Sequence, residues 1–360
     1  MSGIAPEPLN LPALPPKPTI SIAITAYNYG SFLPECLDSC LRQTVWVDQI
    51  VVVDDGSTDD TQQVLADYSA RYPNIVGIRQ PNRGMCGATN TALAHCTGDV
   101  VLLLDSDDVI VPERVEKVIE ALRQPVDGRL PGWVHHYLMR FADGRPSIGL
   151  TPHYGPDAPQ GLLASTVVDQ AGSPVQTMTS GLAFRREVLA AMGPLDEMRH
   201  MTQDQQMRTG AALLSPLAWI PEALTRYRMH GSSDSAALMV TTERVARTRE
   251  CHVGVDVWVR QLLERRQAGS SASWRPLDDQ PAYLWLSFLQ RWWAGERRDY
   301  DLLRRIIDHP DTRRGSRLVR WHYRAGLYLP KSLYVAYLRF VFGYSPLKSF
   351  VRTAIGRNRS

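Results

Sequence analysis

The chain has 360 residues, 44% of them hydrophobic and 21% charged, and a formal net charge of +3. This is the composition of a globular protein with one or two domains. So small a net charge gives no support for a nucleic-acid partner. No run reaches the roughly 18 apolar residues of a membrane-spanning helix. The five cysteines show no CxxC spacing, which argues against a disulfide framework or a zinc site and favours a reducing cytoplasm.

The two ends of the chain differ in composition from the rest. Residues 1–18 contain six prolines but neither a basic start nor an apolar core, so we expect an extended lead-in and no signal peptide. From Arg313 to the C-terminus there are eleven Lys or Arg and no Asp or Glu, interleaved with aromatic residues. This pattern favours contact of residues 313–360 with an anionic surface, either a membrane or a partner.

Strand and helix patterns alternate four times over roughly 100 residues after the lead-in. The expected strands are Ile20–Thr25, Ile50–Val53, Ile75–Ile78 and Val100–Leu104. The expected helices are Ser31–Thr44, one capped by Ser57 and ending near Tyr72, a short one within 82–96, and one from Pro112 to Leu122. The alternation predicts an α/β fold with a doubly wound, mostly parallel sheet flanked by helices. Ligands bind such sheets beyond the carboxyl ends of the strands.

The second half of the chain is less regular. Residues 125–180 are rich in Gly and Pro, which predicts mixed strands and loops. Short helices are expected over Glu187–Met192 and Asp204–Leu214. From about residue 241 the sequence becomes rich in Arg and Trp and predicts a mainly helical C-terminal extension.

Polar clusters stand at the ends of three of the expected strands. They are Thr25-Ala-Tyr-Asn28, Asp54-Asp-Gly-Ser57 and Asp105-Ser-Asp-Asp108. Three clusters on one rim indicate a single site. Side chains two apart share a face of a strand, so Asp105 and Asp107 can converge, and like charges that close repel unless a cation lies between them. Oxygen ligands suit Mg²⁺ or Mn²⁺ bridging to substrate phosphates, which predicts an enzyme acting on a phosphorylated substrate.

Several motifs in order resemble a known family. They are Ile22-Ala-Ile-Thr-Ala-Tyr-Asn28, Val51-Val-Val-Asp-Asp-Gly-Ser-Thr-Asp59, Asn82-Arg-Gly84 with Ala88 and Asn90, Thr97-Gly-Asp99, and Leu104-Asp-Ser-Asp-Asp108. This set resembles the inverting nucleotide-sugar glycosyltransferases of family 2, which have the GT-A fold. The resemblance is dense over 20–125 and looser over 175–232. It implies a GT-A domain over 19–240, with a nucleotide half at about 19–125 and an acceptor half at about 126–240, followed by the helical, basic and aromatic region 241–360.

The resemblance implies roles for the matching positions. Thr25, Tyr27, Asn28, Asp55, Arg83 and Asp105 would form the nucleotide site. Tyr27 would stack on the base, which Thr25 helps to seat, and Asp55 would accept the imide N–H of uracil or thymine. Arg83 would reach the ribose or pyrophosphate, and Asp105 would face the ribose. Asp107 would ligate Mg²⁺ or Mn²⁺, which offsets the charge on the leaving diphosphate.

Inverting transfer also needs a base for the acceptor hydroxyl. The family places an acidic pair about a hundred residues after the metal motif, and Thr202-Gln-Asp-Gln205 falls there, following Ser180-Gly-Leu-Ala-Phe-Arg-Arg186 and Gly193-Pro-Leu-Asp196. Asp204 is therefore the candidate base, although Gln203 replaces the usual glutamate. Tyr227-Arg-Met-His230 also resembles a family segment. It implies that His230 ligates the metal or contacts the pyrophosphate, and that Arg228 does the latter.

Structural roles are the alternative for several of these residues. Asp54 and Asp55 could cap a turn, and Asp108 could cap the following helix. His135 and His136 point to opposite faces of a strand and are expected to be structural. The segment Lys331–Tyr344 reads either as a core helix or as an interfacial helix at an anionic membrane.

Three other classes of protein compete with the glycosyltransferase interpretation. A phosphoacceptor receiver domain would need a lysine near position 155, and the sequence has none there. A nucleotidyltransferase usually has a basic, Gly-rich phosphate loop at its first strand, and Ala26-Tyr-Asn-Tyr-Gly30 is not one. A catalytically silent nucleotide-sugar-binding subunit would not be expected to keep all the candidate acids.

The sequence as a whole predicts a metal-dependent glycosyltransferase. Its donor would be a UDP-sugar, with dTDP-sugars as the alternative, and its acceptor a surface-polysaccharide or lipid-linked saccharide. We expect it in the cytoplasm, with residues 313–360 as the candidate contact with the inner face of the membrane.

Overall fold

The computed structural model describes residues 5–142, 144–152, 154, 158–197, 203–230, 241–266, 274–314 and 317–342. Contacts divide the chain into two compact units. The first comprises residues up to Arg228 together with Gly254–Arg275, and the second comprises Met229–Val253 and residues from Pro276 onward. The long helix α8, Thr242–Arg265, contributes to both units.

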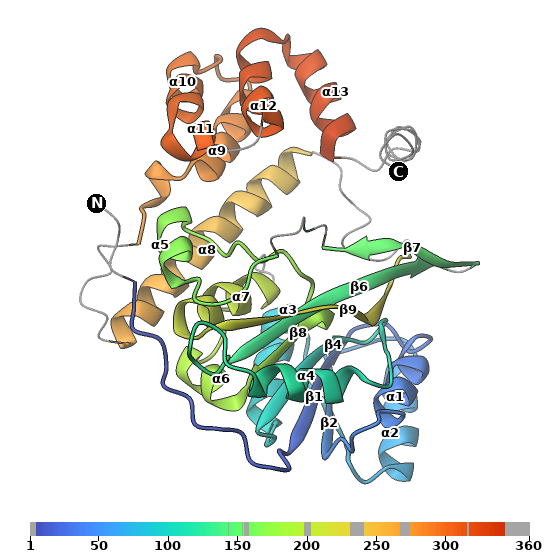
Figure 1. Cartoon of the computed structure of the whole chain (residues 1–360). Helices are drawn as coiled ribbons and strands as arrows, with labels where there is room; N and C mark the ends of the chain where they lie inside the picture. The colour runs from blue at the N-terminus through green and yellow to red at the C-terminus, as the bar shows by residue number, and fades with distance from the viewer. Residues whose placement is uncertain are drawn as a thin grey trace, which may run out of the picture. The chain divides into compact units, whose positions relative to one another are not determined.

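The first unit is built on one mixed sheet (Figure 1). Its strands are β1 Ile20–Ala26, β2 Gln49–Asp54, β3 Ile75–Arg79, β4 Val100–Asp105, β5 Val109–Ile110, β6 Trp133–Ala142, β7 Arg145–Thr151, β8 Leu182–Arg185 and β9 Leu217–Arg228. They lie in the order β3-β2-β1-β4-β8-β6-β9-β5, and β7 pairs with β6. The first four strands in this order are parallel, and β8 pairs antiparallel with both β4 and β6.

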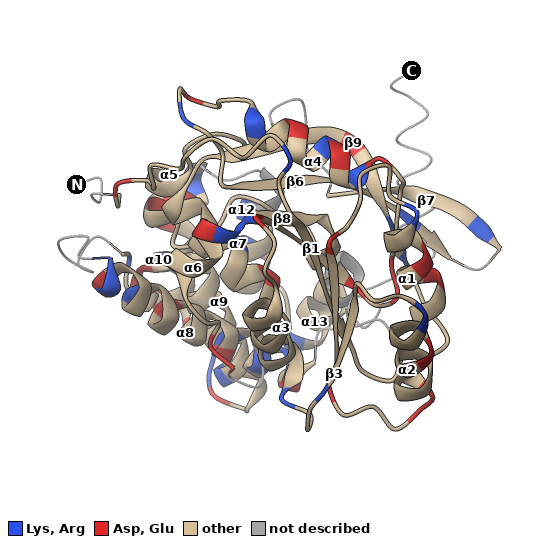
Figure 2. Cartoon of the chain, turned by 90° about the horizontal axis from the view of Figure 1, so that it is seen from below, with Lys and Arg blue, Asp and Glu red and all other residues tan. Residues whose placement is uncertain are grey.

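The helices of the first unit cover both faces of this sheet. They are α1 Leu33–Leu41, α2 Thr61–Arg71, α3 Gly84–His95, α4 Arg114–Arg123, α5 Ala164–Gln170, α6 Arg186–Met192, α7 Gln203–Leu214 and the second part of α8. Figure 2 shows β1 and β3 between α3 on one side and α1 and α2 on the other. The predicted doubly wound α/β sheet is therefore confirmed, with antiparallel pairs added in the second half.

Alternation along the strands explains why both faces are buried. In β4, Val101 and Leu103 enter the core beneath α3, α6 and α7, whereas Val100, Leu102 and Leu104 enter the core beneath α1, α2 and α4. Parallel strands covered on both faces carry such continuous apolar runs. The side chains of odd-numbered residues in β4 therefore share the α3–α7 face, which fixes the direction of Asp105.

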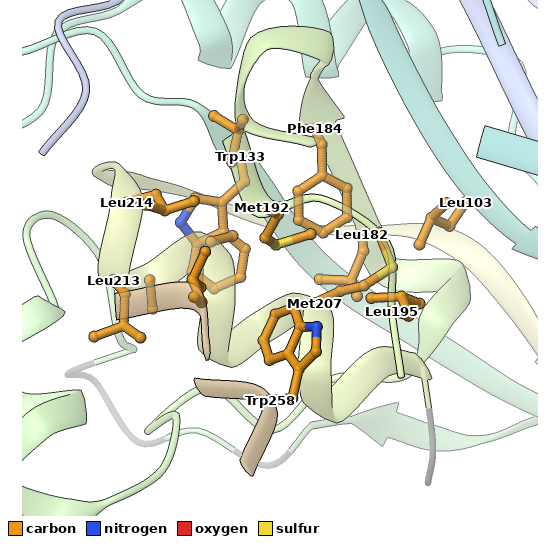
Figure 3. Close-up of a cluster of buried hydrophobic side chains, with 14 of the residues drawn as sticks. Leu103, Trp133, Leu182, Phe184, Met192, Leu195, Met207, Leu213, Leu214 and Trp258 are labelled. Carbon is orange, nitrogen blue, oxygen red and sulfur yellow. The ribbon is translucent and has the colours of Figure 1, made fainter. Parts of the chain in front are cut away.

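The core on the α3–α7 face is dense with large side chains (Figure 3). The rings of Trp133 and Phe184 are stacked, with centroids 6.2 Å apart and an interplanar angle of 3°. From α8, Trp258 is only 1% exposed and donates its indole N–H to the carbonyl of Pro194 at 3.0 Å. A buried Trp with its N–H satisfied contributes its full apolar area without a desolvation penalty.

Two predicted helix starts are wrong. Helix α2 begins at Thr61 after Asp60, so Ser57 does not cap it. The Ser57 hydroxyl instead accepts the backbone N–H of Asn28 at 2.9 Å. Helix α4 begins at Arg114, two residues beyond Pro112. In both cases a turn intervenes between the expected start and the first helical residue.

The proline-rich lead-in packs on the first unit without forming a helix or strand. The backbone N–H of Leu9 donates to Leu214 at 2.7 Å, and Leu11 is 9% exposed. Arg123 donates to the carbonyls of Pro15 and Pro16. Extended proline-rich backbone leaves carbonyls free for such contacts.

The second unit is helical over its described residues. Besides the first part of α8 it contains α9 Pro281–Trp293, α10 Tyr300–Asp308, α11 Pro310–Arg314, α12 Arg317–Tyr328 and α13 Lys331–Phe342. Helix α13 occupies most of the predicted segment Lys331–Tyr344 and buries Tyr334 and Leu338 completely. The basic residues expected beyond Phe342 lie outside the described residues. Among the described helices, none combines the length and apolarity required to cross a bilayer.

Candidate active site

The candidate site lies where the chain reverses its direction of progress across the sheet. From β1 the chain adds β2 and β3 on one side and then returns to place β4 on the other. The register pairs Thr25 of β1 with Asp105 of β4 at the carboxyl ends of both strands. Their neighbours Ala23 and Leu103 enter the α3–α7 core, so Thr25 and Asp105 point to that face. This switch point is where open α/β sheets bind ligands.

Three carboxylates come within electrostatic reach of one another at this point. Burial, and then repulsion from Asp107 and Asp204, raise the pKa of Asp105 to about 8. Asp107, in the turn after β4, is 7% exposed. Asp204 comes from the first turn of α7, almost 100 residues later in the sequence. The fold therefore gathers the three acids that the sequence singled out.

Asp108 turns away from its neighbours into the protein. It is fully buried, and one carboxylate oxygen accepts the backbone N–H of Arg228 at 2.8 Å. Burial, with repulsion from Asp107 and Asp105, raises its pKa well above the usual range. Its hydrogen bond ties β4 to the end of β9, so Asp108 holds the turn in place and does not cap the following helix.

A buried arginine, Arg114, lies close to Asp105 and Asp108. Arg114, the first residue of α4, has no exposed surface and donates to the carbonyls of Leu103 and Leu182. Burial lowers its pKa to about 10, still far above neutrality, so the guanidinium remains charged. Its charge partly offsets that of Asp105 and Asp108.

Arg228 holds the turn that carries Asp107. Its guanidinium donates to the backbone carbonyl of Asp107 at 2.9 Å and pairs with Glu35 of α1. The side chain also lies over the rings of Phe32 and Phe141. These contacts give Arg228 a structural role, and its pyrophosphate contact stays a prediction.

Asp55 organises the start of α3. Its carboxylate accepts the backbone N–H groups of Arg83 and Gly84, each at 2.9 Å, and the side-chain amide of Gln80 at 2.7 Å. A carboxylate has about four acceptor sites, so one remains for an imide N–H. Gly56, at φ +80°, permits the tight turn, since a Cβ there would come within 2.9 Å of the Asn82 nitrogen.

The two candidates just after β1, Tyr27 and Asn28, differ in exposure and partners. Tyr27 is 48% exposed at the rim, as a residue that stacks on a base must be. Asn28 has φ 58°, and its side-chain oxygen accepts the backbone N–H of Thr58 at 2.7 Å. Asn tolerates this left-handed conformation. Asn28 thus joins the loops after β1 and β2, and a contact with nucleotide would be additional to that role.

Arg83 forms a contact that the sequence did not indicate. Its guanidinium makes a two-pronged ion pair with Glu197, and Asn90 donates to the same carboxylate at 3.1 Å. These bonds hold the pKa of Glu197 below its usual range. Pairing with Glu197 ties the start of α3 to the segment after α6, and the ribose or pyrophosphate contact of Arg83 stays a prediction.

Asp204 is also paired. Its carboxylate lies 3.3 Å from the guanidinium of Arg208, one turn further along α7, and both side chains are mostly buried. Arg208 donates as well to the carbonyl of Val175. The neighbouring Gln203 donates to the hydroxyl of Thr179 at 3.0 Å. These contacts fix the start of α7 and therefore the position of the candidate base.

His230 falls within the second unit. It is half-buried and has an interaction within the structure. Thr202 and the residues immediately before it lie outside the described residues. The metal or pyrophosphate role of His230 therefore stays a prediction.

The donor set at the site fits a hard divalent cation. Within the described ranges, no three His, Cys, Asp or Glu side chains gather into a set that could hold a metal by themselves. Mg²⁺ and Mn²⁺ commonly use only one or two carboxylates and complete their shell with substrate phosphates and water. Repulsion from Asp107 contributes to the raised pKa of Asp105, and a cation bound between the two carboxylates would offset that repulsion.

Several residues of the site escaped the sequence analysis. Arg208 could have been found from its i, i+4 spacing to Asp204. Glu35, Arg114 and Glu197 gave no signal, because each looks like an ordinary helix or loop charge and meets its partner across long sequence separations. The hydroxyl of Ser180 accepts the backbone N–H of Asp105 at 2.9 Å. Ser180 belongs to one of the segments that resemble the family, but the resemblance assigned it no role.

Comparisons with known proteins agree with this geometry. A family model described as glycosyl transferase family 2 matches residues 21–189. An uncharacterized glycosyltransferase of Nostoc sp. is 30% identical over 320 residues, which make up 87% of this chain and 97% of the relative. The chondroitin synthase of Escherichia coli is 39% identical over 107 residues, 30% of this chain and 16% of the synthase.

The fold also matches a solved structure. TarS 1–349 of S. aureus, in complex with UDP-GlcNAc, has a TM-score of 0.52 and 17% identity over 89% of each chain. This likeness concerns the fold, and the predicted GT-A architecture is confirmed. The Nostoc relative aligns over 87% of this chain at 30% identity, and the family model covers Asp55, Asp105 and Asp107, so the chain belongs to glycosyl transferase family 2.

Proposed function

We propose that the chain is an inverting, metal-dependent glycosyltransferase that moves a sugar from a nucleotide-diphospho sugar to a hydroxyl group. The observation that carries the proposal is the approach of Asp204, from α7, to the Asp105–Asp107 turn at the switch point of the sheet. A base facing a metal-binding carboxylate pair suits a single displacement, in which the acceptor hydroxyl attacks as the diphosphate leaves.

Each group has a distinct part in this mechanism. Tyr27 stacks on the base, and Asp55 accepts its imide N–H through the remaining acceptor site. Asp107, with Asp105 beside it, would hold Mg²⁺ or Mn²⁺, which offsets charge on the leaving diphosphate. Asp204, oriented by Arg208, takes the proton from the acceptor hydroxyl.

UDP-sugars are the favoured donors. The imide that Asp55 would bind is present in uracil and thymine, so dTDP-sugars are the alternative. The structural neighbour TarS was solved with UDP-GlcNAc, which supports the same preference. The chondroitin synthase relative supports a saccharide acceptor, either a surface polysaccharide or a lipid-linked saccharide.

We place the enzyme in the cytoplasm, at the inner face of the membrane. Trp321, Arg324 and Tyr328 follow at i, i+3 and i+7 along α12, and all three are exposed. Leu333, at the start of α13, is 57% exposed. Aromatic and basic side chains on one helix face suit an anionic lipid surface.

A donor screen tests the proposed reaction. Nucleotide release would be measured for UDP-, dTDP- and GDP-sugars with Mg²⁺, with Mn²⁺ and with EDTA. The proposal expects release from a UDP- or dTDP-sugar that EDTA abolishes. Pyrophosphate release from UTP and a sugar 1-phosphate would instead identify a nucleotidyltransferase, and binding of the sugar nucleotide without turnover would identify a silent subunit.

A further inference from the structure

An aromatic cluster lies on the sheet face that carries the candidate base. Its members are Tyr137 of β6, Tyr154 after β7, and Trp219 of β9, with His135 packed against Trp219. Trp133 and Leu217 enter the α3–α7 core, and the strands pair Trp133 with Leu217 and His135 with Trp219. Two-residue periodicity therefore puts His135 and Trp219 on the same face as α7.

The rings form a platform that is neither core nor free surface. The Trp219 ring lies 4.6 Å from that of Tyr137 and 5.5 Å from that of Tyr154, both nearly perpendicular to it. His135 has no exposed surface and packs at 4.4 Å from Trp219, whereas the other three rings are partly exposed. Within the described residues, neither the indole N–H of Trp219 nor the hydroxyl of Tyr137 forms a hydrogen bond.

A short chain of contacts connects this platform to the base. Arg208 pairs with Asp204 and donates to the carbonyl of Val175. The next backbone N–H, of Gln176, donates to the hydroxyl of Tyr154 at 2.8 Å. Arg208 and Tyr154 thus bind the carbonyl and the N–H of one peptide group, the one that joins Val175 to Gln176. The Arg208 charge also adds to the effect of burial in lowering the pKa of His135 to about 4.

We propose that Trp219 and Tyr137 form the acceptor subsite, on which a pyranose ring of the acceptor saccharide stacks. Aromatic faces with a few unsatisfied polar groups are the usual lining of a ligand site. The ring faces would meet the C–H groups of the sugar, and the indole N–H and phenol would bind its hydroxyls. A hydroxyl that Asp204 deprotonates must lie within about 3 Å of it, so the acceptor has to occupy the neighbourhood of α7. The inference rests on the proposed transferase function.

The test separates acceptor binding from donor binding. Trp219→Ala, Tyr137→Ala and the ring-preserving Trp219→Phe would be compared with wild type. Trp46→Ala is the matched control, because Trp46 is 69% exposed in the loop between α1 and β2. Acceptor probes would be methyl β-glycosides of glucose, galactose and N-acetylglucosamine, with cellobiose and chitobiose, so that no aryl group of the probe can stack.

The proposal expects Trp219→Ala to raise the acceptor KM by roughly tenfold or more, equivalent to about 1.4 kcal/mol. Nucleotide-sugar KM and transfer to water should stay within about twofold of wild type, and Trp219→Phe should restore most of the acceptor KM. Equal effects on donor and acceptor would contradict it, as would unchanged acceptor KM or no transfer to any probe. Failure of the wild type to bind or cleave any nucleotide sugar would instead refute the transferase function itself.

Discussion

At the scale of single residues, the aspartates of the candidate site differ in how far they are bound within the protein. Asp55 accepts backbone N–H groups at the start of α3, and Asp108 accepts one at the end of β9, so both are hydrogen-bonded within the protein. Asp107 and Asp204 instead lie close enough to Asp105 to help raise its pKa. Asp204 comes from α7, and it is paired with Arg208 one turn further along that helix. We therefore assign proton transfer to Asp204 and donor binding to the other two.

Asp204→Asn should abolish turnover while leaving donor binding intact. The amide keeps the shape and a hydrogen bond to Arg208 but cannot take a proton, so a loss of about 100-fold or more in kcat is expected. Calorimetric titration with the nucleotide sugar measures binding, and nucleotide release measures turnover. A variant that loses donor affinity to the same extent as turnover would show that Asp204 is not the base.

Buried histidines should make stability depend on pH. Burial lowers the pKa of His135 to about 4 and that of His136 well below 6.5, so both are neutral in the fold near pH 6. The unfolded chain takes up protons below pH 6.5, so stability is lost as pH falls from about 6.5 toward 4. Per histidine the slope is at most about 1.4 kcal/mol per pH unit.

His135→Phe should remove one histidine's share of that slope. The ring against Trp219 is retained, although the bond to the Pro159 carbonyl at 3.2 Å is lost. Denaturant unfolding at pH 7, 6 and 5 gives the free energy of unfolding of wild type and variant. Parallel pH curves for the two proteins would show that His135 is not held neutral.

At the scale of elements, the turn after β4 depends on strands and helices distant in sequence. The end of β9 reaches it through Arg228, and α1 reaches it through Glu35. Helix α4 adds the buried charge of Arg114. The turn that we propose to bind the metal is therefore held by α1, α4 and β9, which fixes the positions of Asp105 and Asp107 before any ligand arrives.

Arg228→Lys should weaken metal use without unfolding the protein. An ammonium cannot reproduce the fork between the Asp107 carbonyl and Glu35. Loss of such an outer support typically costs 10- to 100-fold in metal affinity, so we expect the Mn²⁺ concentration for half-maximal nucleotide release to rise by at least about tenfold. Arg226→Lys is the control, because the Arg226 side chain also approaches Glu35, at 4.0 Å, but has no described contact with residues 105–108. Equal metal dependence in both variants would refute this role.

At the scale of the whole molecule, the sequence predicted the sheet better than the site's supports. The strands ending at Thr25, Val53 and Leu104 are buried on both faces, and such strands can be recognised in a sequence by their continuous runs of apolar residues. The ion pair of Arg83 with Glu197 spans 114 residues, and no local pattern encodes it. The helix start predicted at Ser57 was wrong because a serine before a helical stretch is a common N-cap, whereas the Ser57 hydroxyl accepts the backbone N–H of Asn28.

The proposed location at the membrane depends on the exposed face of α12. Trp321→Ala combined with Arg324→Glu should reduce sedimentation with phosphatidylglycerol vesicles by roughly tenfold, because it removes an interfacial ring and reverses a charge. Binding to neutral phosphatidylcholine vesicles should be weak for both proteins. Trp46→Ala with Arg42→Glu provides the matched surface control. Equal binding of all three proteins to the anionic vesicles would show that α12 does not face the membrane.

The central claim, metal-dependent sugar transfer at the turn after β4, is tested most directly by nucleotide release from a UDP-sugar by Asp107→Ala across a Mn²⁺ titration. Asp67→Ala, an exposed aspartate on α2, controls for loss of a surface charge. The account predicts a loss of about 100-fold or more for Asp107→Ala at every Mn²⁺ concentration, with wild-type release for Asp67→Ala. Wild-type release by Asp107→Ala would contradict it.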